Sequence, residues 1–113
     1  MASSVQVVVS PLAYRARELA AIEETLRQPW PRTNGQDLSE AHVWLANGFE
    51  DAQVVAWLEA GVFRPITARL LQLERIEPRE LGQEFSAGES LGYAFCAGLC
   101  SFKTVKRIVE GTL

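Results

Sequence analysis

The segments Trp44-Leu45-Ala46-Asn47-Gly48-Phe49 and Trp57-Leu58-Glu59-Ala60-Gly61-Val62 decide the fold, because the same pattern returns after thirteen residues. In each copy a glycine follows a short apolar stretch, and an apolar residue follows the glycine. This order is typical of the Schellman motif, in which a left-handed glycine ends a helix and the next side chain packs one turn back. The repeat therefore predicts two consecutive short helices, each ended by glycine.

A third, degenerate copy follows the two clear ones. Phe63 is an insertion, Pro65 is a good first residue for a helix, and Arg75-Ile76 takes the place of the glycine and its apolar neighbour. Three leucines replace the tryptophan position: Leu70, Leu71 and Leu73. Pro78 then predicts a fourth, very short helix that ends near Gly82.

The C-terminal part contains two further helix-start patterns. Ser86-Ala87-Gly88-Glu89 has the S-x-x-E form of a capping box, which predicts a helix from there to Gly98. Because this stretch is apolar nearly all round, we expect a central buried helix whose Gly88 and Gly92 allow another helix to approach closely. Ser101 is the expected cap of the last helix, which ends at Gly111, thirteen residues after Gly98.

The N-terminal part of the chain lacks the thirteen-residue repeat. Ser10 and Pro11 predict the start of a helix over residues 11–28. Its apolar stripe is formed by Leu12, Ala16, Leu19, Ile22 and Leu26. Residues 29–37 read as a loop, and Asp37-Leu38-Ser39-Glu40 as a capping box that opens a short-helix array over 38–113. The valine-rich residues 1–10 are expected to form an extended arm, with pairing to a second copy as one alternative.

The expected fold is all-α. Helices of about ten residues are too short to be stable alone and must bury their apolar faces against neighbours. A chain of 113 residues suits one hydrophobic core. We therefore predict a single helical domain over 11–113, a compact array of six or seven short helices with helix-turn-helix-like pairs.

Composition and motifs argue against an enzyme. No apolar run is long enough to span a membrane and no secretory signal is visible, so we expect a cytoplasmic protein without a membrane partner. Cys96 and Cys100 cannot form a disulfide framework and are expected to be buried thiols, and His42, the only histidine, has no evident nucleophile partner. No phosphate-binding loop or metal-ligand set is present, so we expect no catalytic residues, no metal and no cofactor.

The first functional hypothesis is a protein-interaction module or adaptor, with a protein or a second copy of the chain (a homodimer) as partner. Residues 37–63 hold five carboxylates and no Lys or Arg, so an aromatic surface with an acidic rim would suit a basic partner. Trp30, flanked by prolines, is the aromatic expected to be most exposed. The candidate partner-binding residues are Trp30, Glu50, Asp51 and Phe63. That surface would comprise Trp44, Phe49, Trp57, Val62 and Phe63, and the alternative is that these residues are simply core and the carboxylates its solvated outside.

The second hypothesis is a helix-turn-helix DNA-binding regulator. The required spacing of small and apolar residues is met, with a one-residue turn, by Ala94, Gly98, Leu99, Val105 and Ile108. Lys103, Lys106 and Arg107 would then contact phosphates or bases from the recognition helix. Packing of glycine-ended helices produces the same pattern, and the acidic middle of the chain would repel a polyphosphate, so nucleic acid ranks second.

Overall fold

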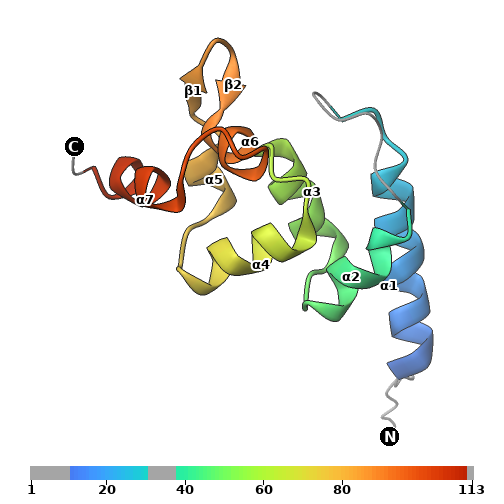
Figure 1. Ribbon diagram of the computed structural model, residues 1–113. Coiled ribbons are helices and arrows are strands. Elements are labelled where there is room, and N and C mark those ends of the chain that lie inside the picture. The colour runs from blue at the N-terminus through green and yellow to red at the C-terminus, as the bar shows by residue number, and fades with distance from the viewer. Residues whose placement is uncertain (1–10, 31–37, 112–113) are drawn as a thin grey trace, which may run out of the picture.

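The computed structural model describes residues 11–30 and 38–111. In these residues the chain forms seven helices and one two-stranded antiparallel hairpin (Figure 1). The elements are α1 (Pro11–Leu26), α2 (Glu40–Ala46), α3 (Asp51–Glu59), α4 (Pro65–Leu73), α5 (Pro78–Leu81), β1 (Glu84–Ser86), β2 (Glu89–Ser90), α6 (Leu91–Cys96) and α7 (Phe102–Glu110). The predicted all-α array of short helices is confirmed.

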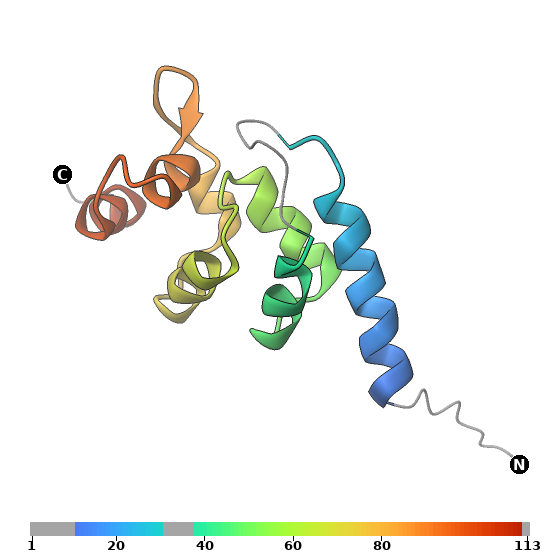
Figure 2. The same cartoon turned by 45° about the vertical axis from the view of Figure 1, so that its right-hand side comes forward.

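The helices pack mainly against close neighbours in sequence, and their buried side chains form one hydrophobic core cluster. Helix α1 packs on α2 and α3, α2 packs on α4, and α3 packs on α5. Helix α6 joins α5 to α7, so α1 and α7 lie at opposite ends of the molecule in both views (Figures 1 and 2). Each short helix thus depends on its close neighbours in sequence, as in repeat proteins.

The thirteen-residue repeat forms the helix ends that the sequence predicts. Gly48 and Gly61 adopt left-handed backbone with φ of 88° and 95°. The N–H of Phe49 donates to the Trp44 carbonyl at 3.1 Å, and that of Val62 to the Trp57 carbonyl at 2.9 Å. The rings of Trp44 and Phe49 meet edge to face with centroids 5.2 Å apart. Both ends are Schellman motifs, and the first also has the expected apolar contact.

The degenerate third copy closes its helix in the same way without glycine. Arg75 takes the left-handed conformation with φ of 63°, and the N–H of Ile76 donates to the Leu71 carbonyl at 3.0 Å. A left-handed conformation is unfavourable for a residue with a Cβ atom. The hydrogen-bond pattern and the burial of Ile76 maintain it here.

The aromatic residues of the repeat are buried in the hydrophobic core and are not exposed at the surface. Trp44 and Phe49 are fully buried and Trp57 is 2% exposed, together with the Val62 that follows the second glycine. The hypothesis of an aromatic interaction surface around Trp44, Phe49, Trp57, Val62 and Phe63 is therefore wrong for the first four residues, whereas Phe63 is half-buried. The first four side chains are core because helices this short gain stability only through such burial.

The predicted helix over 86–98 is wrong in its first part. Ala87 and Gly88 both have positive φ, 45° and 81°, so they form the two-residue turn of the β1–β2 hairpin, and Ser86 pairs with Glu89 across it. The true cap is Ser90, whose Oγ accepts from the Tyr93 N–H at 3.1 Å. Gly88 lies in the turn rather than on a helix.

Another segment of the chain does approach Gly92 closely, as the sequence predicts. A Cβ atom at Gly92 would overlap the carbonyl oxygen of Ala60 at the end of α3. The Ser90 hydroxyl also donates to that carbonyl at 2.8 Å. These contacts fix the start of α6 against the end of α3.

The N-terminal predictions need smaller corrections. Helix α1 ends at Leu26 rather than at residue 28, and only the second half of its stripe is buried, since Leu12 is 81% exposed. Helix α2 begins at Glu40, two residues later than the box at 37–40 predicts. Asp37 and the proposed arm at 1–10 lie outside the described residues.

Over 11–30 and 38–111, no helix is long and apolar enough to cross a membrane. The same residues contain no cluster of three or more His, Cys, Asp or Glu side chains suited to a metal ion.

Candidate functional site

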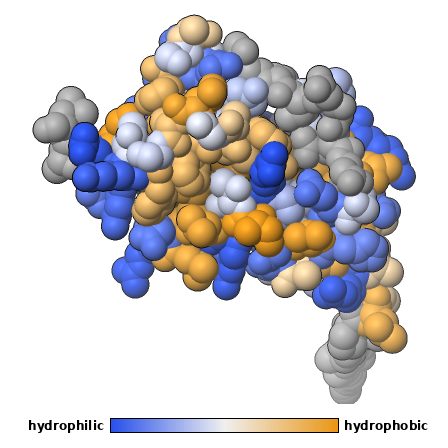
Figure 3. Space-filling view, viewed as in Figure 1, coloured by the Kyte–Doolittle hydropathy of each residue, from blue (hydrophilic) through white to orange (hydrophobic). Residues whose placement is uncertain are grey.

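An apolar stripe runs along the outer face of α4. Ile66, Leu70 and Leu73 are 61%, 48% and 65% exposed. Their spacing of four and three residues places them on one side of the helix, opposite the fully buried Ala68 and Leu71. Figure 3 shows apolar residues in a row over the place where Figure 1 has α4. We call these three residues the α4 stripe.

The composition of α4 is unusual for a helix at the protein surface. Its sequence, PITARLLQL, is apolar on almost every side, whereas a surface helix ordinarily carries polar residues opposite the core. Single exposed leucines are normal, but contiguous exposed apolar side chains mark interaction sites. The α4 stripe is the strongest candidate for such a site in the described residues.

The charges around the stripe are mostly positive. Arg64, Arg69 and Arg75 are exposed, and α4 itself carries no carboxylate. The first carboxylate after the helix, Glu74, lies 3.6 Å from the Lys106 ammonium of α7 and is thus compensated. Helix α4 and its immediate flanks therefore carry a net positive charge, and we call Arg64, Arg69 and Arg75 the basic rim of α4.

The α4 stripe is absent from the residues predicted above, although the sequence contains a signal for it. Leu70 and Leu71 are adjacent, so on a helix they point about 100° apart, and with Leu73 they cover more of the helix than one core-facing stripe needs. Reading all three leucines as substitutes for the tryptophan concealed this conflict. Only Leu71 occupies the tryptophan position, because its carbonyl accepts the Ile76 N–H.

Glu50 and Asp51, two of the predicted partner-binding residues, have internal contacts. Glu50 is the N-cap of α3 and accepts a hydrogen bond from the Tyr14 hydroxyl, which raises the Tyr14 pKa above its ordinary value of 10.0. Asp51 accepts from the Thr25 hydroxyl, and its own N–H donates to Glu18 at 3.2 Å. The structure thus uses this pair to attach α1 to the start of α3, and a role in partner binding stays a prediction.

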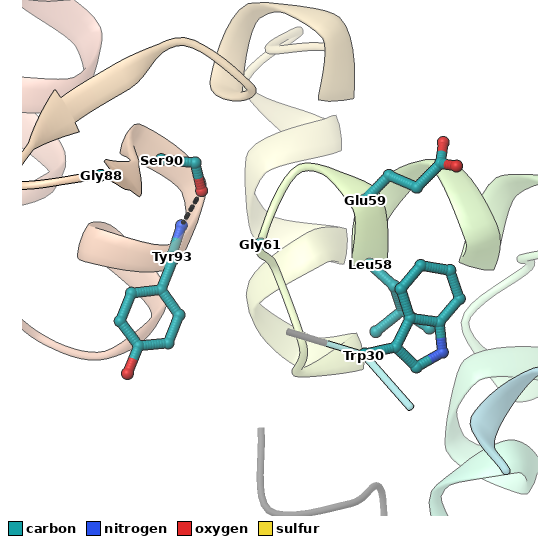
Figure 4. A pocket seen from close by; sticks show the side chains of 7 residues that line it. All are labelled: Trp30, Leu58, Glu59, Gly61, Gly88, Ser90 and Tyr93. Atoms are coloured by element: carbon teal, nitrogen blue, oxygen red, sulfur yellow. Dashed lines mark hydrogen bonds between the residues drawn. The ribbon is translucent and has the colours of Figure 1, made fainter. Parts of the chain in front are cut away.

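Trp30 is half-buried rather than the most exposed aromatic, which is Tyr14 at 42%. The Trp30 indole N–H donates to the Thr25 carbonyl at 2.8 Å, so the end of α1 holds the ring. Phe63 is also half-buried, with its ring 5.9 Å from that of Tyr93 and the Arg64 guanidinium above it. Tyr93 and Trp30 line one cavity of about 310 Å³ (Figure 4).

The helix-turn-helix geometry differs from the one the sequence suggested. Residues 97–101 separate α6 from α7, so the turn is not one residue long, and Leu99, an expected anchor, is 58% exposed. Lys103 and Arg107 are exposed on α7, while Lys106 contacts Glu74. The three basic residues share a helix, but the predicted turn is wrong.

The remaining candidates for chemistry are unremarkable in their surroundings. Cys96 and Cys100 are half-buried free thiols, and burial raises the pKa of both, which disfavours the reactive thiolate at neutral pH. His42 is exposed on α2.

Comparisons of the chain with protein-family models, with curated proteins and with solved structures find no match.

Proposed function

We propose that this domain is a protein-interaction module that binds an amphipathic, acidic helix of a partner protein along the α4 stripe. The observation that carries the proposal is the exposure of Ile66, Leu70 and Leu73 on one helix face. A helical partner is favoured because three side chains at this spacing offer a straight apolar line, which the i, i+4, i+7 anchors of a second helix match.

Charge favours an acidic partner over a second copy of the chain. The rim formed by Arg64, Arg69 and Arg75 attracts carboxylates and repels another basic rim, so two α4 helices packed face to face would bring like charges together. An apolar row inside a basic surface also makes a poor fit to a phosphate backbone, which needs polar contacts across its whole width.

The expected affinity is modest. Burying the exposed half of each stripe residue contributes about 1 kcal/mol, and the facing leucines of the partner contribute a similar amount, so the two faces together contribute about 6 kcal/mol before the rim charges contribute and before the cost of association is subtracted. Removing one residue should therefore lower the affinity about fivefold. Such strengths are typical of transient contacts, and a partner helix that reaches additional surface would bind more tightly.

The test uses a fluorescein-labelled designed helical peptide with leucines at i, i+4 and i+7 and glutamates on its flanks. Fluorescence anisotropy should show saturable binding to the protein, a fivefold or larger loss for Leu70→Gln, and unchanged binding for Leu12→Gln. Leu12 is the matched control because it is an exposed leucine far from the stripe on α1.

Three results would overturn the proposal. The first is equal binding by Leu70→Gln and the native protein. The second is a monomer–dimer equilibrium in sedimentation that Leu70→Gln abolishes, because the occupant would then be a second copy. The third is duplex DNA binding that Leu70→Gln weakens.

A further inference from the structure

The cavity beside Trp30 has a chemistry of its own, different from that of the α4 stripe. Its lining residues come from the end of α1, the end of α3, the hairpin turn and the start of α6: Trp30, Leu58, Glu59, Gly61, Gly88, Ser90 and Tyr93. Figure 4 shows Trp30 and Leu58 on one side and Ser90 and Tyr93 on the other, with Gly61 between them. Its volume of about 310 Å³ lies at the lower end of the range of ligand sites.

The walls of this cavity are held in place by backbone contacts. A Cβ atom at Gly61 would come within 2.7 Å of the Tyr93 nitrogen, so the two backbones touch there. The Ser90 hydroxyl bridges the walls, since it donates to Ala60 at 2.8 Å and accepts from Tyr93 at 3.1 Å. The cavity is therefore formed before any ligand enters, which lowers the entropic cost of binding.

The side chains that line the cavity favour a positively charged ligand. Glu59 is the one charged side chain among the seven lining residues, and it is exposed. Within residues 11–30 and 38–111 its carboxylate has no ion-pair or hydrogen-bond partner, so an incoming group displaces none. Trp30 adds an aromatic face, which attracts cations, whereas Figure 4 shows the Tyr93 ring turned away from Trp30.

We infer that this cavity binds an organic cation, a guanidinium or ammonium group on an alkyl stem. Leu58 and Trp30 contact the stem, and Glu59 pairs with the charged end. An arginine or lysine side chain of a protein and a free small amine share this chemistry. The inference concerns a surface separate from the α4 stripe and holds whether or not the stripe binds a helix.

The test is a titration followed by ¹⁵N NMR with four capped amino acids: N-acetyl arginine, lysine, norleucine and glutamate N-methylamides. The arginine and lysine compounds should shift the amides of Gly61 and Gly88 and the indole of Trp30 saturably. Norleucine, which lacks the charge, should bind roughly two- to thirtyfold more weakly, and glutamate not at all.

Matched variants identify the contribution of the carboxylate. Glu59→Gln should weaken arginine binding about two- to fivefold, whereas Glu110→Gln, an exposed carboxylate on α7, should leave it unchanged. A Gly-Gly-Arg-Gly-Gly peptide that binds more tightly than the capped amino acid assigns the ligand to a protein side chain, and equal affinity assigns it to a free cation. Norleucine binding equal to arginine, no response to Glu59→Gln, or no shift at all would overturn the inference.

Discussion

Helices α3 and α4 have the same length and the same type of C-terminal cap, but opposite outer faces. Both have nine residues, and each is closed by a left-handed residue followed by a buried apolar one. Helix α3 exposes Ala52, Gln53 and Glu59 to solvent, whereas α4 exposes Ile66, Leu70 and Leu73. The two helices thus share the cap and the buried side and differ at the outer face, which is where the proposed binding site of α4 lies.

The largest expected effect is a loss of unfolding free energy when the glycines that end α2 and α3, Gly48 and Gly61, are replaced. Gly48→Ala should cost about 1–2 kcal/mol of unfolding free energy, because only the left-handed strain is added and nothing lies within 4 Å. Gly61→Ala should cost about 2–5 kcal/mol, because the new methyl group also overlaps Tyr93. Urea unfolding followed by circular dichroism measures both, and equal losses would contradict the close packing of α3 against α6.

A smaller effect of opposite sign is expected where the repeat lacks glycine. Arg75→Gly should raise the unfolding free energy by about 0.5–1 kcal/mol, because it relieves the left-handed strain at φ of 63° at some cost in chain entropy. Arg69→Gly in the middle of α4 is the control and should lower it by about 1 kcal/mol. A loss of stability in Arg75→Gly would show that the Arg75 side chain contributes more than its backbone costs.

The smallest effect concerns the attachment of α1 to α3. The hydrogen bond to Glu50 raises the pKa of Tyr14 in the folded chain, so it favours the protonated phenol. Its stabilisation is fully present below pH 10.0 and is lost as the pH rises through the folded pKa. Urea unfolding should therefore show the native protein more stable than Tyr14→Phe at pH 8, with the gap closing above pH 10. A gap that stays constant to pH 11 would contradict this contact.

The sequence predicted those parts of the fold that local rules determine. Glycine spacing located the ends of α2 and α3, and Pro65, Pro78 and Ser101 located three helix starts. The hairpin was missed because Ser86-x-x-Glu89 also satisfies a capping box, and only the positive φ of Ala87 and Gly88 excludes a helix there. The same four-residue pattern is therefore compatible with a helix start and with a hairpin turn.

The candidate site was less predictable than the fold. Which of Leu70 and Leu71 faces inward depends on how α4 sits against α2, a contact between segments distant in sequence. The flanking prolines predict that Trp30 is a partner-binding residue, whereas the residues that line the cavity with it belong to α3, the hairpin and α6. Glu50 and Asp51 look like free surface charge in the sequence, because Tyr14 and Thr25 lie on another helix.

The most direct test of the central claim, that the outer face of α4 binds an acidic helix, is a charge exchange across the contact. Two labelled peptides with the same leucines, one with glutamates and one with lysines on its flanks, are titrated into the native protein and into Arg69→Glu. We predict that the native protein prefers the acidic peptide and that Arg69→Glu weakens or reverses the preference at low salt. The same preference in both proteins, or none in the native one, would contradict the claim.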